Sequence, residues 1–237
     1  MNVLLTNDDG ISSPGIIKLA QAIRAKAKYN VYTLAPDSNR SGISNGLSIM
    51  ASPIKITEIS EQSWSCSGFP ADCVILAVLG ALPFKPDIVV SGINSGVNIG
   101  IDILYSGTAA AARQGAIMGL PSIAFSLAAK QSFNWDMAAA YCAEHLDEFL
   151  NMWENDIFIN VNIPNTDKSP EKFVKTWPAT KQYNDNVSVF KGPGNCDWAY
   201  LVPEKPTIEM EEGSDWDAVS KGLVSASPVY VYPVTRR

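Results

Sequence analysis

The chain has 237 residues, of which 46% are hydrophobic, and its 18 basic and 24 acidic side chains give a net charge of −6 at pH 7. This length predicts one large domain, or one domain with a small appendage. There is no block of Lys and Arg, so we exclude a protein that binds a nucleic-acid polymer through a basic face. No apolar run is long enough to span a membrane. Because residues 1–5 lead into a strand and not into a charged and then apolar leader, we expect a soluble cytoplasmic protein.

The cysteines and the single histidine argue against several kinds of site. The four cysteines form no Cys-x-x-Cys pair, so we expect reduced thiols and neither a zinc site nor a redox motif. The one histidine, His145, lies in a helical pattern of apolar residues. A Ser-His-Asp or histidine-phosphatase mechanism would have to run through it, which its place on a helix flank disfavours.

Apolar runs and helical patterns alternate over the first two thirds of the chain. A short apolar run at residues 3–5 predicts a buried strand. Beyond it, Ser12 or Ser13 is placed to cap a helix, and Pro14 suits the first turn of that helix. The other strands expected here cover residues 30–35, 54–57, 63–67, 88–90, 123–127 and 157–162, and the helices cover residues 14–23, 68–79, 106–119 and 135–153.

This alternation of strand and helix predicts an α/β fold of the Rossmann-like, doubly wound kind, with a mostly parallel sheet. We assign residues 1–165 to this core domain. Prolines, glycines and short alternating runs then indicate β-ribbons at residues 173–177, 187–190 and 198–202, followed by a short helix at 216–222 and a strand at 224–232. We assign residues 166–237 to a β-ribbon and carboxyl-terminal segment that serves in oligomerisation.

The acid pair Asp8-Asp9 follows the first strand directly, in a loop before the first helix. Ligands bind at this position in open α/β sheets, and Gly10 permits the turn that would bring both side chains to one site. Two carboxylates held close together repel each other unless a cation or a proton lies between them, and Mg²⁺ or Mn²⁺ is the natural partner of oxygen ligands. Taken alone, an Asp-Asp-Gly sequence is better explained as a solvated turn with Asp9 as a helix cap.

Two more strand-end loops bring suitable ligands to the same edge of the sheet, because right-handed crossovers place the loops after parallel strands on one rim. Residues 39–42 and 91–94 add a hydroxyl and a side-chain amide to the two carboxylates, an all-oxygen set suited to Mg²⁺ or Mn²⁺. Beside them, Ser106, Gly107 and Thr108 open a helix whose free backbone N–H groups form an anion site. A metal site beside a phosphate site is the arrangement that phosphoryl chemistry uses.

The chain closely resembles the SurE family of survival-protein-E, metal-dependent nucleotidases, which act on 5′- and 3′-nucleotides. The resemblance is strongest before residue 127 and extends in order through residues 160–164 and 224–225. Its motifs are LLTNDDGI at residues 4–11, APD at 35–37, NRSG at 39–42, VSGIN at 90–94 and YSGTAAA at 105–111.

The resemblance implies where the ligands lie. It places the metal ligands at Asp8, Asp9, Ser41 and Asn94. It places Asn98, Ser106, Gly107 and Thr108 close to the substrate phosphate. It also implies a homodimer, or a homotetramer built as a dimer of dimers, in which carboxyl-terminal ribbons reach across to the neighbouring subunit.

Together, the residues and the resemblance predict a 5′-nucleotidase, a phosphoric monoester hydrolase that converts nucleoside monophosphates to nucleoside and phosphate. The ion would act as a Lewis acid on a phosphoryl oxygen and lower the pKa of a bound water. Asp8 or Asp9 would accept the proton from that water.

Two other functions stay open. A nucleoside hydrolase also uses strand-end aspartates and a cation, although its amino-terminal run of several aspartates is missing here. A non-catalytic protein that senses nucleotide or phosphate could use the same scaffold. A haloacid-dehalogenase-type phosphatase is disfavoured because the acids are adjacent and not spaced as Asp-x-Asp, and a dinucleotide-dependent oxidoreductase is disfavoured because no Gly-x-Gly-x-x-Gly follows the first strand.

Overall fold

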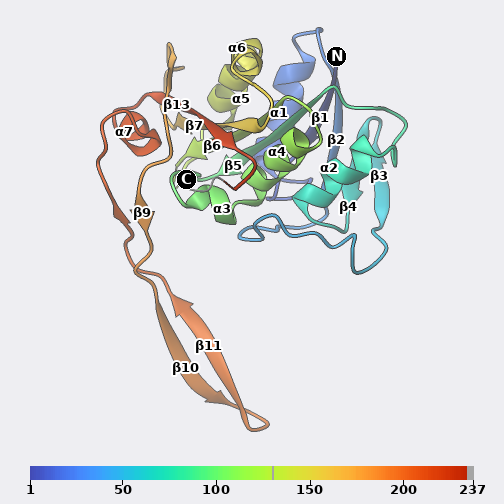
Figure 1. Cartoon of the computed structure of the whole chain (residues 1–237). Coiled ribbons are helices and arrows are strands. Elements are labelled where there is room, and N and C mark those ends of the chain that lie inside the picture. The colour runs from blue at the N-terminus through green and yellow to red at the C-terminus, as the bar shows by residue number, and fades with distance from the viewer. Residues whose placement is uncertain (130, 234–237) are drawn as a thin grey trace.

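A nine-stranded sheet forms the centre of the computed structural model, which describes residues 1–129 and 131–233 (Figure 1). From edge to edge the strands are β3 (Ile56–Ser60), β4 (Ser63–Cys66), β2 (Asn30–Pro36), β1 (Asn2–Thr6), β5 (Ile88–Ser95), β6 (Ser122–Ala128), β7 (Ile157–Pro164), β13 (Val224–Tyr230) and β8 (Phe173–Lys175). The strands from β4 to β7 run parallel, β3 and β13 pair antiparallel with β4 and β7, and β8 pairs parallel with β13. The predicted α/β fold with a mostly parallel sheet is confirmed.

Helices cover both faces of this sheet, and consecutive residues of β1 supply the two cores. Val3 and Leu5 pack on one face with α1 (Pro14–Arg24), α5 (Trp135–Glu144) and α6 (Leu146–Asn151). Leu4 packs on the other face with α2 (Pro70–Val78), and α4 (Gly107–Ile117) covers the same face after the short helix α3 (Asp102–Tyr105). A strand whose successive side chains point to opposite faces must be apolar throughout when both faces are covered, which explains the uninterrupted apolar runs of the sequence.

The winding of the sheet reverses at β1. The chain passes from β1 to β2 on one side, and it later returns to β5 on the other side of β1. The loops that follow β1, β2 and β5 therefore meet at the carboxyl ends of the central strands. This reversal is the point at which open α/β sheets bind ligands.

The structure differs from the sequence prediction in the helix expected over residues 135–153. It is interrupted at His145, where the backbone leaves the helical region at φ −96° and ψ 8° and separates α5 from α6. The imidazole Nδ1 lies 2.7 Å from the Glu148 carboxylate in the first turn of α6, and the ring lies against Tyr141. This pairing gives the single histidine a structural role at a helix junction.

The carboxyl-terminal segment contributes to the central sheet as well as to an extension. β8 covers part of residues 173–177, which we expected to form a ribbon, but it is instead an edge strand of the main sheet beside β13. β9 (Lys181–Gln182) pairs with β12 (Thr207–Ile208), and β10 (Asn186–Gly192) pairs with β11 (Cys196–Val202) in a hairpin that projects from the body (Figure 1). The short helix α7 (Asp215–Ser220) lies between β12 and β13.

None of the helices in the described part of the chain is long and apolar enough to cross a membrane. The cytoplasmic location stays a prediction.

Helix α1 packs closely on β5 at Gly15, and a substitution there tests this packing. A Cβ added at Gly15 would lie 2.1 Å from the Ile93 carbonyl oxygen, so the helix would have to move away from the strand. In an open helix, Gly→Ala gains about 1 kcal/mol. Here we expect Gly15→Ala to destabilise instead, because overpacking typically costs about 1–3 kcal/mol. Urea unfolding measures the difference.

The exposed residue Gln21 of the same helix provides the control. Gln21→Ala should change the free energy of unfolding by less than about 0.5 kcal/mol. A Gly15→Ala variant that is as stable as the parent would contradict the close approach of α1 to β5.

Candidate metal and phosphate site

The acid pair lies at the end of β1, where the winding of the sheet reverses. Asp8 is almost fully buried and Asp9 is partly exposed. Asp8 lines a cleft of about 350 Å³ together with Ser41, Asn94 and Ser106. These residues come from the end of β1, the loop after β2, the end of β5 and the start of α4. The strand-end loops that the sequence predicted to converge do meet at one cleft.

Asn7 and Gly10 build the turn that brings both carboxylates to this edge. The Asn7 amide nitrogen donates to the Gly10 carbonyl (3.0 Å) and to the Ser13 hydroxyl (2.8 Å), and its oxygen accepts from the Gly10 N–H (3.2 Å). Gly10 has a φ of +98°, in the left-handed region that favours glycine. The sequence motifs alone assign no role to Asn7, although its place directly before the acid pair is the signal for this one.

The Asp8 carboxylate is buried against the start of α4. Its Oδ1 accepts a hydrogen bond from the Thr108 hydroxyl. Burial raises the pKa of Asp8, the Thr108 hydrogen bond opposes this, and the nearby charge of Asp9 adds to the increase. A carboxylate in such a place is stabilised in its charged form by a cation beside it. The Arg40 N–H also donates to the Asp8 carbonyl (2.7 Å), which holds the loop that carries Ser41 beside the acid pair.

Asp9 lies next to the cleft and is held by groups from two loops. It accepts hydrogen bonds from the Ser95 N–H (3.1 Å), the Ser95 hydroxyl (3.2 Å) and the Asn39 amide (3.4 Å). Asn94, the neighbour of Ser95, donates from its amide nitrogen to the Gly96 carbonyl (3.0 Å). That bond leaves the amide oxygen of Asn94 as the atom that could meet a cation.

The start of α4 approaches Asp8 closely. A Cβ added at Gly107 would lie 2.7 Å from the Asp8 Cβ, so glycine is required for this approach. The Ser106 hydroxyl accepts from the Ala109 N–H (3.1 Å) and caps the helix. Because the Thr108 hydroxyl is bonded to Asp8, the donors that α4 offers to an anion are the first backbone N–H groups, which lack partners within a helix.

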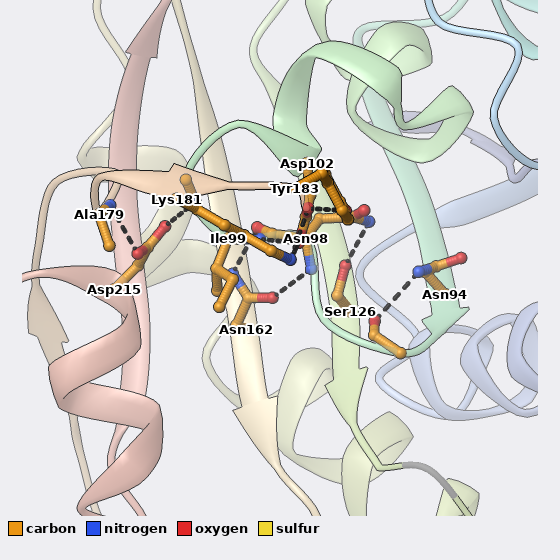
Figure 2. Close-up of polar contacts among 12 residues, drawn as sticks. Asn94, Asn98, Ile99, Asp102, Ser126, Asn162, Ala179, Lys181, Tyr183 and Asp215 are labelled. Carbon is orange, nitrogen blue, oxygen red and sulfur yellow. Dashed lines mark hydrogen bonds and ion pairs between the residues drawn. The ribbon is translucent and has the colours of Figure 1, made fainter. Parts of the chain in front are cut away.

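Asn98 also lines the cleft, and hydrogen bonds to β6 and β7 hold it in place (Figure 2). Its N–H donates to the Asn162 side-chain oxygen (2.8 Å), and its amide nitrogen donates to the Ser126 hydroxyl (2.9 Å). Its carbonyl accepts from the side-chain amides of Asn160 (2.8 Å) and Asn162 (3.0 Å). The two β7 asparagines, which point to the same face of the strand, therefore fix the loop that carries Asn98.

Asp102 connects this loop to the base of the carboxyl-terminal extension (Figure 2). Its carboxylate accepts from the Lys181 ammonium at 2.6 and 2.7 Å, from the Tyr183 hydroxyl, and from the Ile99 N–H at 3.3 Å. Lys181 and Tyr183 both line the cleft, as does Asp102 itself. We had not predicted this cluster, because no local motif links Asp102 to side chains about 80 positions later in the chain.

A family model described as Survival protein SurE matches residues 3–188. The chain belongs to the SurE family. A protein of Geobacter sulfurreducens named 5′-nucleotidase SurE is 37% identical, with 98% of this chain and 88% of that protein covered. A protein of the same name from Kosmotoga olearia is 36% identical, with 98% and 93% covered. The crystal structure of the SurE protein from Aquifex aeolicus matches with a TM-score of 0.84 at 36% identity, covering 99% of this chain and 95% of the other.

In this SurE-family chain, the donor set fits a hard divalent cation. Within residues 1–129 and 131–233, no three His, Cys, Asp or Glu residues gather as a possible metal cluster. A cation in the cleft would therefore take the acid pair together with hydroxyl and amide oxygens, which suits Mg²⁺ or Mn²⁺ and not zinc. Buried Asp8, whose charge lacks a cationic partner among the described side chains, is the observation that supports this fit. The roles of the predicted site residues stay predictions.

Gly107→Ala tests the contact between α4 and Asp8 in this SurE site. The added methyl group would displace the Asp8 side chain, so we expect the affinity for Mn²⁺ to fall by about 10–100-fold, as is common when the groups that orient a metal ligand are changed. Isothermal titration with Mn²⁺ measures this affinity. Ile117→Ala, at the other end of α4, is the control and should bind Mn²⁺ as the parent does. Equal affinities of the parent and Gly107→Ala would show that this contact does not orient Asp8.

Proposed function

We propose that the chain is a divalent-metal-dependent phosphomonoesterase that hydrolyses nucleoside 5′-monophosphates, and also 3′-monophosphates, to nucleoside and phosphate. The observation that carries this proposal is the approach of the start of α4 to Asp8, because free helix N–H groups favour an anion and a buried carboxylate favours a cation beside it. Membership of the SurE family supports it, because curated relatives that cover nearly the whole chain are named 5′-nucleotidases.

In this proposal, Asp8, Asp9, Ser41 and Asn94 hold Mg²⁺ or Mn²⁺. When bound there, the ion supplies Lewis acidity toward a phosphoryl oxygen and lowers the pKa of water.

The residues of the chain have distinct tasks around the phosphate. The first N–H groups of α4, at Gly107 and Thr108, bind the phosphoryl oxygens and stabilise the charge that develops on them. Asn98, fixed by its bonds to β7, limits where the phosphate can lie. Asp8 or Asp9 accepts the proton of the attacking water. Thr108 orients the Asp8 carboxylate through its hydroxyl.

Neither alternative function gains support. A nucleoside hydrolase would cleave the bond between sugar and base, and a sensor would bind nucleotide without turnover. The curated relatives carry the name of a phosphate-releasing enzyme.

Incubation of the protein with AMP and Mn²⁺ separates these functions: the proposed enzyme releases phosphate and adenosine, a nucleoside hydrolase releases adenine, and a sensor releases neither. Chelation of the metal should abolish the release of phosphate.

Asp8→Asn and Asp9→Asn should each remove most of the phosphate release from AMP, because each takes a negative charge from the proposed metal site. Changes to residues that only orient metal ligands commonly cost about 10–100-fold in activity, so the loss of a ligand should cost at least as much. Asp136→Asn, at an exposed ion pair with Lys18, is the control and should be as active as the parent. Near-normal turnover by both Asp8→Asn and Asp9→Asn would defeat the assignment, provided that circular dichroism shows folded protein.

We also propose that the protein is a homodimer or a homotetramer held together through the β10–β11 hairpin. The hairpin projects from the body in Figure 1, and six of its large apolar side chains are more than half exposed. These are Val187, Val189, Phe190, Trp198, Tyr200 and Leu201. A two-stranded hairpin is marginally stable alone in water, and a contiguous exposed apolar patch marks an interaction surface.

Light scattering of the intact protein tests this assembly. We expect a dimer or a tetramer at micromolar concentration, and replacing residues 186–202 with a short flexible linker should lower the oligomeric state. That deletion leaves Lys181 and Tyr183 in place, so any change in activity would report on assembly and not on loss of the Asp102 cluster. A monodisperse monomer would show that the hairpin serves another purpose.

A further inference from the structure

The cleft that holds the proposed metal and phosphate sites has an aromatic end. Tyr105 and Tyr183 line it together with Asp8 and Ser106. Their rings are 6.3 Å apart between centroids at an angle of 70°, and the two residues are 52% and 43% exposed. Both tyrosines therefore line the cleft while about half of each residue is open to solvent.

Each of the two tyrosines is fixed by its surroundings. Tyr105 is the last residue of α3 and stands directly before Ser106, the cap of α4, so its ring lies next to the proposed phosphate site. Its carbonyl also accepts from the Ser44 N–H (2.9 Å), which secures the backbone. The Tyr183 hydroxyl donates to Asp102, a residue that is 7% exposed.

Exposed tyrosines are ordinary on protein surfaces, and most have no function. The Tyr183 hydroxyl donates to the buried Asp102 carboxylate, and burial and this carboxylate both raise the pKa of the hydroxyl. Its ring is therefore held in place although it is not buried in the core. A ring that is already ordered loses little side-chain entropy when a ligand packs on it.

The charges near the aromatic end are balanced. Among residues 1–129 and 131–233, Lys181 is the only cationic side chain that lines the cleft, and it is paired with both oxygens of Asp102 at 2.6 and 2.7 Å. A ligand portion bound here would therefore be uncharged and flat, whereas an anionic portion belongs at the start of α4. A nucleoside monophosphate has this division between base and phosphate.

We propose that Tyr105 and Tyr183 form a stacking surface for the base of the nucleoside monophosphate, with Asp102 as the residue that positions Tyr183. This inference rests on the proposed nucleotidase function. Every base has a π face, so stacking on aromatic side chains tolerates all bases. The enzyme should accept every base, with purines preferred over pyrimidines because they bury more apolar area. It should discriminate strongly against phosphomonoesters that lack a base.

The test compares AMP with ribose 5-phosphate, which carries the same sugar and phosphate without the base. Tyr105→Leu and Tyr183→Leu should each raise KM for AMP by about 10-fold, in line with the loss of one base-stacking contact, and should leave kcat within about threefold. The KM for ribose 5-phosphate, or its inhibition constant if it is not turned over, should stay at the parent value. Tyr183→Phe keeps the ring and should affect AMP less than Tyr183→Leu does.

A control variant and a second measurement complete the experiment. Tyr230→Leu, an exposed tyrosine at the end of β13 that does not line the cleft, should match the parent toward both substrates. Calorimetric titration with adenosine, which has the base and no phosphate, measures the stacking contribution without turnover. Both leucine variants in the cleft should bind adenosine about 10-fold more weakly than the parent.

The possible outcomes separate the two proposals. If the parent releases phosphate from AMP but the leucine variants keep its KM for AMP and its affinity for adenosine, the stacking surface is wrong and the nucleotidase function stands. Equal increases in KM for AMP and for ribose 5-phosphate would also overturn the stacking surface, because they would show a general disturbance of the cleft. A parent that releases no phosphate from AMP with Mn²⁺ present would overturn the proposed function and the stacking surface together.

Discussion

The site depends on one close approach, that of the start of α4 to the end of β1. Only glycine at position 107 leaves room for it, since a Cβ there would lie 2.7 Å from the Asp8 Cβ. The approach buries Asp8, which disfavours its charge, and at the same time places it beside the positive end of a helix, which favours its charge. The proposed cation would tip this balance toward the carboxylate, and it would link metal binding to the packing of α4 through a single side chain.

Buried asparagines fix a second part of the cleft, the 97–102 loop that carries Asn98. Asn160 and Asn162 are fully buried on β7, where a polar side chain is costly unless it makes hydrogen bonds; of their side-chain polar atoms, the Asn160 oxygen alone lacks a partner among the described residues. Both donate to the Asn98 carbonyl, and Asn162 also accepts from the Asn98 N–H. These bonds replace water around the backbone of the 97–102 loop. A loop held in this way is preorganised, so it need not be reordered when a substrate binds.

The sequence predicted those parts of the site whose positions follow from local residue patterns and from the topology of the sheet. The apolar run before Asp8 and the glycine after Asp9 fixed a strand and a turn, and parallel strands then required the loops at residues 41 and 94 to converge. The Asp102 cluster could not be found in this way, because its partners come from a short strand far along the chain whose position depends on tertiary contacts. The same limit applies to β8, which joins the sheet only through its pairing with β13.

The buried pair of Asp102 and Lys181 is better explained by geometry than by stability. Both side chains are more than nine-tenths buried, and removing charges from water costs roughly what their attraction returns. Two apolar residues of similar volume could pack there at no loss of stability, but they could not accept hydrogen bonds from the Tyr183 hydroxyl and the Ile99 N–H. The carboxylate therefore joins the 97–102 loop to the segment that carries Lys181 and Tyr183. It fixes where β9 meets the 97–102 loop, and with that it fixes the shape of the cleft at its aromatic end.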